Sequence, residues 1–353
     1  MKEIKIGNKK IGKGNPCFII AEAGVNHNGR LDLAYKLVDI AKDSGVDAVK
    51  FQTYKTKDLV TGSAKMAEYQ VKNTGKRQNQ EQMLQSLELG YQDFAKLKKY
   101  CDKKKIIFLS TPHTEDSFEF LKRIVPAFKI GSGDLTNLPF LEKVAKAGKP
   151  VILSTGMATL KEAKEAYQIV KKHNPKVIIL HCSTEYPCPL EDVNLRVLKT
   201  FAKNFDCPIG YSDHTQGIDV TIMAANLGAL VVEKHFTIDK KMAGPDHRAS
   251  LSPSELKEMV KAIRSGKKIE IPELVLGSSV KKPTAKELQS AKVARKSLVA
   301  NIDIPKGVAI TSKMIAIKRP GTGIAPKYLD KIIGKVVKRE ILRDSLISKR
   351  DLC

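Results

Sequence analysis

Short apolar runs alternate along this chain with longer amphipathic stretches, and the alternation repeats eight times. Continuous apolar runs are typical of strands that are covered on both faces of a parallel sheet. The stretches between them have helical spacing, as in Leu33, Leu37 and Ala41, with lysines on the opposite face. The expected strands are 17–23, 48–52, 106–111, 127–132, 151–155, 177–182, 208–212 and 230–236.

Eight strands that are each followed by a helix close a barrel more naturally than they fill an open sheet. We therefore predict an α/β fold, a (β/α)8 TIM barrel, for residues 1–266. In the second unit an insertion at 55–90 delays the helix until Tyr91. Long loops of this kind on a compact scaffold usually carry function.

The βα rhythm stops after the eighth expected helix. Residues 267–293 contain Pro272 and Pro283 and are interpreted as a linker. Residues 294–353 contain short strand-like pieces separated by Pro and Gly turns, which predicts a small, separate β-rich domain.

The charge of the chain raises the question of nucleic acid, since 62 lysines and arginines against 38 acidic residues give a net charge of +24. The lysines are spread as pairs and triplets, such as 103–105 and 171–172, over helix ends and loops. We therefore expect a solvated basic surface and no nucleic-acid partner. A positive field of this kind would also draw in a small polyanionic substrate.

The six cysteines form no C-x-x-C pair and no dense, even framework, so reduced thiols are expected. The first twenty residues interleave charges with apolar residues, unlike a signal peptide or a membrane span. We expect a cytoplasmic protein without a membrane partner.

Polar side chains crowd the carboxyl ends of the expected strands, where a barrel of this type has its active site. In chain order these ends present Glu22, Asn26, His27, Lys50, Gln52, Ser110, Thr111, Lys129, Ser132, Ser154, Thr155, His181, Thr184, Tyr186, Ser212, Asp213, His214, Glu233 and His235. Strands chosen for packing alone would end less uniformly in such residues.

Two lysines, Lys50 and Lys129, would point into one mouth. Burying them there without a partner is costly, so an anionic ligand is expected between them. The turns at 131–133 and 154–156 could supply hydroxyl and N–H groups to phosphate oxygens, although each turn alone is also explained as a helix cap.

Two histidines, His214 and His235, end neighbouring strands and could share one metal ion, with oxygen ligands or water completing its shell. A structural role is the alternative for any single histidine. His173, on a lysine-rich helix end, is interpreted as structural.

Several sequence runs, in order, carry a family resemblance. They are EAGVNHNG at 22–29, KFQT at 50–53, STP at 110–112, FKIGSGD at 128–134, LSTG at 153–156, YSDHT at 211–215, EKHF at 233–236 and GPDH at 244–247. The pattern resembles the N-acetylneuraminate (sialic acid) synthase family, and IKRPG at 317–321 resembles the SAF, or antifreeze-like, domain that these synthases carry.

The resemblance implies roles for individual residues. Lys50 and Lys129, with Glu22, would be catalytic, and His214 and His235 would bind Mn²⁺, with Mg²⁺ or Co²⁺ as alternatives. The substrate-binding residues implied are Thr111, Ser132, Ser154, Thr184, Tyr186, Ser212, Asp246 and Arg319. Thr184 stands where some relatives carry asparagine, and both side chains can hydrogen-bond a phosphate.

The implied reaction condenses phosphoenolpyruvate with an N-acetylated amino sugar. C3 of phosphoenolpyruvate attacks the aldehyde of the ring-opened sugar, which the metal polarises. Water adds at C2 and phosphate leaves by C–O cleavage, with Glu22 stabilising the cation and handling the water's protons. The alternative for Glu22 is a salt-bridge partner at the edge of the core.

Arg319 lies too far along the chain to reach its own barrel mouth easily. In the family this arginine reaches the sugar of a partner subunit, so the resemblance implies a domain-swapped homodimer. Without the resemblance, a solvated surface arginine would be the interpretation.

The acceptor sugar stays open between two branches of the family. GPDHRASL at 244–251 resembles the sialic and legionaminic acid branches rather than the pseudaminic branch. The acceptor implied is N-acetylmannosamine or a close N-acetylated analogue, and the alternative is a legionaminic acid synthase that uses 2,4-diacetamido-2,4,6-trideoxymannose. A 3-deoxy-octulosonate or heptulosonate phosphate synthase is a more distant alternative, and a nucleic-acid- or ice-binding module would leave the polar strand ends unexplained.

Overall fold

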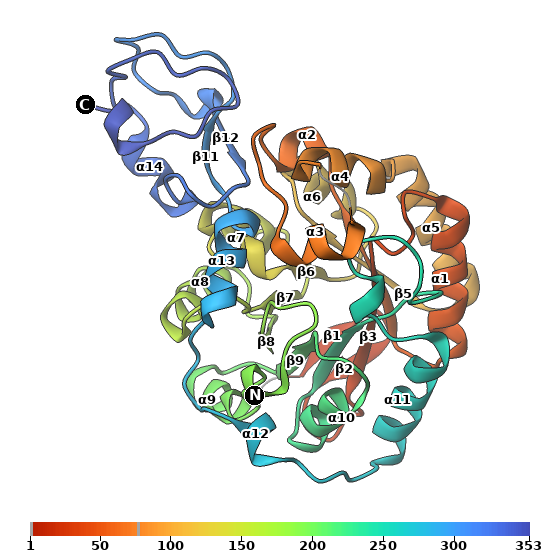
Figure 1. Ribbon diagram of the computed structural model, residues 1–353. Coiled ribbons are helices and arrows are strands. Elements are labelled where there is room, and N and C mark those ends of the chain that lie inside the picture. Colours follow the sequence, from red (N-terminus) through yellow and green to blue (C-terminus); the bar gives the residue numbers. More distant parts are fainter. Residues whose placement is uncertain (1–2, 76–77) are drawn as a thin grey trace.

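A barrel of eight parallel strands forms the body of the molecule in the computed structural model, which describes residues 3–75 and 78–353 (Figure 1). The strands are hydrogen-bonded in the order β5-β4-β3-β10-β9-β8-β7-β6, and β5 lies beside β6, so the sheet curls into a nearly closed barrel. Their bounds are β3 (Phe18–Gly24), β4 (Ala48–Thr53), β5 (Ile107–Pro112), β6 (Phe128–Ile130), β7 (Val151–Ser154), β8 (Val177–Cys182), β9 (Ile209–Asp213) and β10 (Val231–His235). The predicted fold class and all eight predicted strands are confirmed.

Eight helices follow these strands and surround the barrel. They are α1 (Leu31–Asp43), α5 (Tyr91–Lys104), α6 (Glu115–Leu121), α7 (Leu138–Ala145), α8 (Leu160–His173), α9 (Val197–Asn204), α10 (Asp219–Asn226) and α11 (Pro253–Ser265). The apolar stripe of α1 is buried against the sheet through Leu33, Leu37 and Ala41, as its spacing predicts. Reciprocal capping boxes begin α8 and α11, at Thr159 with Glu162 and at Ser252 with Glu255.

A short hairpin before the barrel was not predicted from the sequence. It pairs β1 (Ile4–Ile6) with β2 (Lys9–Ile11) in antiparallel fashion. Its isoleucines pack with Phe18, Ile20, Ile152 and other residues that fill the amino-terminal end of the barrel interior. The hairpin therefore seals the end of the barrel opposite the polar strand ends.

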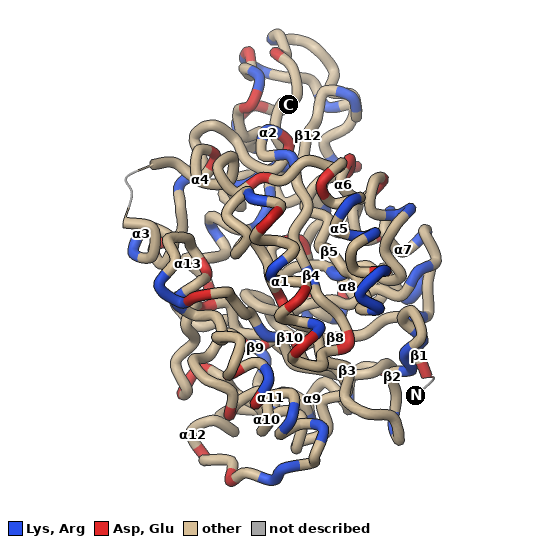
Figure 2. Tube along the Cα trace, turned by 90° about the vertical axis from the view of Figure 1, so that its right-hand side faces the viewer, with Lys and Arg blue, Asp and Glu red and all other residues tan. Residues whose placement is uncertain are grey.

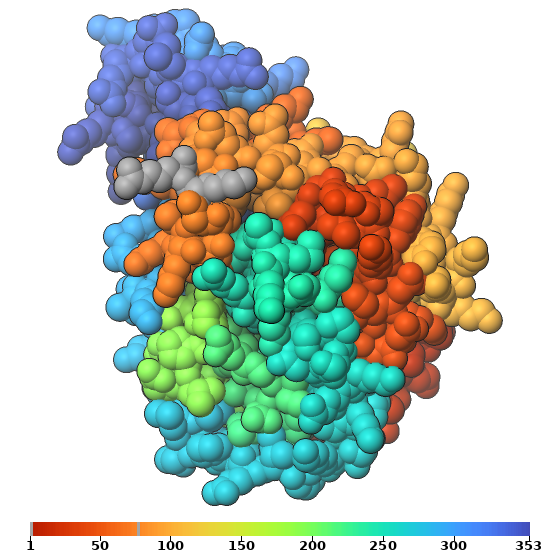
Figure 3. Space-filling model, turned by 45° about the vertical axis from the view of Figure 1, so that its right-hand side comes forward, coloured from red at the N-terminus to blue at the C-terminus, as the bar shows by residue number. Residues whose placement is uncertain are grey.

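The insertion of the second unit is ordered into three short helices, α2 (Thr56–Leu59), α3 (Glu68–Thr74) and α4 (Gln80–Leu87). The helices α2 and α4 contribute Leu59 and Met83 to a small apolar cluster, which also contains Tyr54 and Met66 from the segments between the helices. The insertion lies between the barrel mouth and the C-terminal domain, where its orange atoms meet the blue ones (Figure 3).

The segment interpreted as a linker carries two helices, α12 (Glu273–Leu276) and α13 (Ala285–Ala294). The C-terminal domain after it pairs β11 (Ser297–Ala300) with β12 (Ile315–Lys318) and adds a short helix, α14 (Leu329–Ile332). It has its own apolar core around Leu298, Ile304 and Ile347, so it is a small β-rich unit, as predicted.

Register and alternation bring the polar strand ends together. His235 lies opposite Glu22, Glu22 opposite Lys50, and Glu233 opposite Ser212. On β10 the alternating positions send Glu233 and His235 into the barrel mouth, whereas Lys234 points outward and pairs with Asp213 at 2.8 Å.

Lysines and arginines are scattered among acidic residues in the view of Figure 2 and form no single stripe there. Within the described ranges, no helix is long and apolar enough to cross a membrane.

Candidate active site

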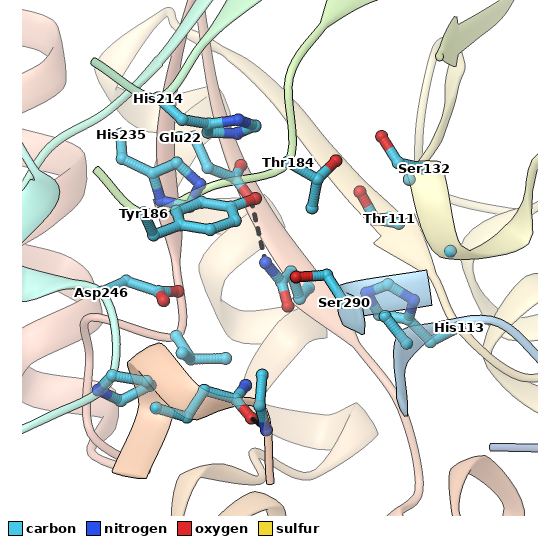
Figure 4. A pocket seen from close by; sticks show the side chains of 18 of the residues that line it. Glu22, Thr111, His113, Ser132, Thr184, Tyr186, His214, His235, Asp246 and Ser290 are labelled. Carbon is cyan, nitrogen blue, oxygen red and sulfur yellow. Dashed lines mark hydrogen bonds between the residues drawn. The ribbon is translucent and has the colours of Figure 1, made fainter. Parts of the chain in front are cut away.

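One pocket opens at the carboxyl ends of the barrel strands, and every residue to which the resemblance assigns a role lines it (Figure 4). Six of the other polar strand-end residues do not line it: Asn26, His27, Ser110, Thr155, His181 and Asp213. The strand ends form its floor. Its walls come from the insertion through Tyr69, Gln70 and Met83, from α13 through Ser290, and from the C-terminal domain through Arg319. Segments far apart in the chain therefore meet at this mouth.

Four buried charges form a network at the floor of the pocket. The ammonium of Lys50 lies 2.7 Å from a carboxylate oxygen of Glu22 and 3.6 Å from one of Glu233. The ammonium of Lys129 lies 3.3 Å from Glu233. Thr111 accepts a hydrogen bond from Lys50 at 3.2 Å, and Ser212 donates one to Glu233 at 3.2 Å.

This network corrects one part of the sequence argument. We expected Lys50 and Lys129 to be buried without protein partners, but Glu22 and Glu233 pair with them. The sequence places Glu233 at a strand end without showing that it lies between the two lysines. Glu22 is thus a salt-bridge partner and a pocket-lining residue at once.

The network shifts proton affinities in opposite directions. Burial, with repulsion from Glu233, raises the pKa of Glu22 to about 7, although Lys50 opposes the shift. Burial also pushes the pKa of Glu233 upward, but Lys129 and Lys50 hold it below its usual value. The two carboxyls therefore differ in protonation near neutral pH, and Glu22 is suited to taking up and releasing a proton.

A second side of the pocket consists of hydroxyls and backbone amides. The N–H of Gly156 donates to the hydroxyl of Ser132 at 3.0 Å. The hydroxyl of Ser154 is buried and has no hydrogen-bond partner among the described residues. A buried hydroxyl of this kind facing a polar pocket is suited to a ligand oxygen.

Aromatic rings crowd the third side. Tyr186 packs on His214 with ring centroids 4.2 Å apart and on Tyr69 at 4.9 Å, and its ring lies edge-on to His235. Asp246 lies beside this group (Figure 4).

The two predicted metal-binding histidines lie side by side, with ring centroids 5.6 Å apart. Nδ1 of His214 contacts the carbonyl of Ser183 at 2.7 Å, which leaves Nε2 for a ligand. Nδ1 of His235 is buried without a hydrogen-bond partner in the described part of the chain. Burial and the neighbouring His214 hold the pKa of His235 well below its usual value, so its imidazole is neutral, the form that binds metals.

No group of three or more His, Cys, Asp or Glu side chains that could hold a metal occurs among residues 3–75 and 78–353. The histidine pair fits a divalent ion whose remaining ligands are water or substrate oxygens, which is an open type of site.

Arg319 corrects a second expectation. It reaches the mouth of its own barrel, where it is partly buried and lines the pocket. Its backbone forms a parallel bridge with Val60 of the insertion, donating to the carbonyl of Leu59 at 2.9 Å and accepting from the N–H of Thr61 at 3.0 Å. The insertion, whose fold could not be read from the sequence, brings the C-terminal domain within reach.

Several pocket residues were missed by the sequence analysis, and His113 and Ser290 are two of them. His113 follows the predicted Ser110–Pro112 run and contacts Asp134 at 3.4 Å, and Ser290 lies on α13. The position of His113, just beyond a polar strand end, was a usable signal. The sequence offered no such signal for Ser290, because a short polar helix in a linker has no strand end to locate it.

The fold and this pocket define a class: a (β/α)8-barrel enzyme with a small C-terminal domain that contributes Arg319 to the pocket. The NeuB family model matches residues 37–271, and the SAF domain model matches residues 295–352. The chain therefore belongs to the NeuB family, and the resemblance predicted from its motifs is confirmed.

Named relatives are similar over nearly the whole chain. The N,N'-diacetyllegionaminic acid synthase of Campylobacter jejuni is 45% identical, over 93% of this chain and 98% of that protein. The N-acetylneuraminate-9-phosphate synthase of Homo sapiens is 39% identical, over 96% and 93%. The crystal structure of the spore coat polysaccharide biosynthesis protein SpsE of Bacillus subtilis has a TM-score of 0.85 at 36% identity and covers 100% of this chain and 99% of that one.

Asp246 gives the site a testable pH dependence. Burial raises its pKa to about 6 in the folded protein, although His214 opposes the shift. The folded state then binds more protons than the unfolded state between the two pKa values, so this carboxyl costs stability as the pH rises from about 4 to about 6. We therefore compare the unfolding free energy of Asp246→Asn with that of wild type at two pH values. The difference should shift in favour of the variant by about 1–2 kcal/mol when the pH rises from about 5 to about 7.

Urea unfolding of chelator-treated protein at both pH values measures this difference. A constant difference between wild type and variant would contradict the raised pKa.

Proposed function

We propose that this protein condenses phosphoenolpyruvate with an N-acetylated amino sugar and water to form a nonulosonic acid and phosphate. The preferred acceptor is 2,4-diacetamido-2,4,6-trideoxymannose, and the product is a legionaminic acid. The observation that supports the reaction is the pocket itself, where two lysines, a proton-exchanging carboxyl and a histidine pair meet at one mouth. The choice of acceptor is supported by the higher identity to the legionaminic acid synthase than to the N-acetylneuraminate-9-phosphate synthase.

The donor would lie on the floor of the pocket. Lys50 and Lys129 would face its carboxylate and phosphate, with Thr111, Ser132, Ser154 and Ser212 as hydrogen-bonding groups. Each lysine already has a carboxylate partner, so an incoming anion would join an existing network rather than meet an isolated charge. Thr184, beside Ser132, is suited to a phosphate oxygen as well.

Glu22 would handle the protons of the reaction. With a pKa of about 7, its carboxyl can take a proton from the water that adds at C2 and release it as phosphate leaves. In its ionised form it also stabilises the positive charge that develops at C2.

The acceptor would lie at the outer side of the pocket, near Tyr186, Asp246 and Arg319. We propose that His214 and His235 hold a divalent ion there, with Mn²⁺ favoured over Mg²⁺ and Co²⁺. When bound, this ion would supply Lewis-acid polarisation of the acceptor's aldehyde oxygen.

The acceptor test compares two sugars in one assay. Purified protein with phosphoenolpyruvate and Mn²⁺ should release phosphate with both sugars, and kcat/KM should be about tenfold higher or more for the diacetamido sugar, because its extra amide gains contacts in the transition state. In water labelled with ¹⁸O, C–O cleavage should leave the label in the sugar acid and not in phosphate.

Phosphate release with neither sugar would exclude the proposed reaction. A preference for N-acetylmannosamine would move the protein to the sialic acid branch.

The metal test uses binding as well as turnover. Chelation should abolish activity and added Mn²⁺ should restore it, because the imidazoles of His214 and His235 are the only protein ligands proposed. Electron paramagnetic resonance should show one bound Mn²⁺ for each wild-type chain and weakened binding in His214→Ala. His173→Ala, which changes a histidine on the outer surface, is the matched control. Full activity of His214→Ala in chelating buffer would show that the metal site is misassigned.

We also propose that two copies form a homodimer and exchange their C-terminal domains. Exchange of an identical element would reproduce the contacts around Arg319 between chains, so the single-chain arrangement is compatible with it. The linker after α11, which contains Pro272 and Pro283, provides the connection that would cross over.

Mixing two inactive variants tests this exchange. Arg319→Ala and Glu22→Ala should each be nearly inactive, but a mixed dimer has one site that pairs an intact barrel with an intact C-terminal domain. Random mixing of equal amounts makes about half of the dimers mixed, and each mixed dimer has one working site of its two. Activity should therefore recover to about a quarter of wild type. Mixtures that stay inactive despite confirmed subunit exchange would place Arg319 in its own chain's site.

A further inference from the structure

Helix α13 lies at the rim of the pocket, beside the loops that follow β7 and β8, although it belongs to the segment interpreted as a linker. Ser290, a residue of this helix, lines the pocket. Just before the helix, the buried Lys281 donates to the carbonyl of Cys182 at 3.0 Å, at the end of β8. Just after it, Lys296 donates to the carbonyl of His113 at 2.5 Å and pairs with Asp134 at 2.7 Å. The helix is therefore fixed to the pocket at both of its ends.

One carboxylate of α13 reaches into the barrel loops. Glu287 is buried, and its Oε1 accepts hydrogen bonds from the backbone N–H of Met157 at 2.7 Å and of Thr184 at 2.8 Å. Its Oε2 accepts from the N–H of Thr284 at 3.1 Å, which is the ordinary capping box of the helix. The first two bonds join the loop after β7 to the loop after β8, and no capping requirement explains them.

These two loops form a part of the pocket where space is very limited. A Cβ added at Gly156 would lie 1.9 Å from the hydroxyl oxygen of Thr184 and 2.7 Å from that of Ser132. The next residue, Met157, has a φ of +61°, a left-handed conformation that is strained for a side chain of this kind. Contacts must hold such a turn in place, and Met157 is bonded through its N–H to Glu287 and through its carbonyl to Arg295 at 2.8 Å.

We propose that Glu287 is a positioning residue for the donor end of the active site. Its carboxylate sets the separation of the loops that carry Gly156 and Thr184. The inference rests on the proposed function, because it assigns these loops to phosphoenolpyruvate. Glu287 acts through the backbone and does not touch the substrate.

The test compares two glutamates at the same position of a capping box. Glu255 caps α11 as Glu287 caps α13, but its carboxylate contacts its own helix start and Lys240 on the outer surface. Glu287→Ala should raise the KM for phosphoenolpyruvate about tenfold or more while changing kcat and the KM of the acceptor little, because one end of the pocket is displaced. Glu255→Ala, which loses the same cap, should leave all three constants close to wild type.

A second readout does not depend on turnover. Amide hydrogen exchange of segments 155–158 and 183–186 should accelerate in Glu287→Ala by about tenfold or more, because two buried N–H groups lose their acceptor. Glu287→Gln keeps one carbonyl oxygen and should restore much of the protection and of the donor KM. If Glu287→Ala does not fold, the comparison of Glu287→Gln with Glu255→Gln decides instead.

Unchanged exchange and unchanged donor KM in the Glu287 variants would overturn the proposal, as would an equal rise of the donor KM in Glu255→Ala. If the wild-type protein does not use phosphoenolpyruvate, the proposed function fails, and with it the donor assignment. Hydrogen exchange would still show separately whether Glu287 holds the two loops.

Discussion

The active site depends on one constraint, which is that the charges of Glu22, Lys50, Lys129 and Glu233 must be buried together. In a medium of low polarity each of these charges is costly alone, and removing one leaves its neighbours uncompensated. The barrel meets this constraint through strand register, since it places Glu22 opposite Lys50 and lets Glu233 lie between the two lysines. The same neighbours hold the two carboxyls at different pKa values, which the proposed chemistry uses.

The barrel supplies a rigid floor, and the remaining walls come from three segments that are unrelated in sequence position. The insertion at 55–90, the helix α13 and the C-terminal domain all meet above the strand ends. The insertion and the C-terminal domain contact each other through the backbone bridge between Val60 and Arg319, and α13 contacts the barrel through the bond from the N–H of Met157 to Glu287. Such contacts can be formed and broken with less loss of stability than an apolar core, so the floor and the walls have different tolerances to change.

The sequence predicted the strands, the start of α5 at Tyr91 and the pocket lining, because period and strand ends are local signals. It missed the hairpin at Ile4–Ile6 and Lys9–Ile11, because strands of three residues with interleaved lysines carry too little pattern. It missed α13 because this helix has no apolar stripe and is held by polar contacts such as that of Glu287. It did not show that Arg319 reaches the mouth of its own barrel or that Lys129 has a carboxylate partner, because both depend on neighbours that are distant in the chain.

The bridge between Val60 and Arg319 attaches the C-terminal domain to the insertion without using the side chain of Arg319, because both of its hydrogen bonds use backbone atoms of that residue. A different amino acid at this position would leave the two domains attached in the same way and would change only the group presented to the pocket. The side chain at position 319 can therefore change without altering the backbone contacts between the domains. Among proteins built on this plan, the side chain that faces the pocket at this position could change through a single codon.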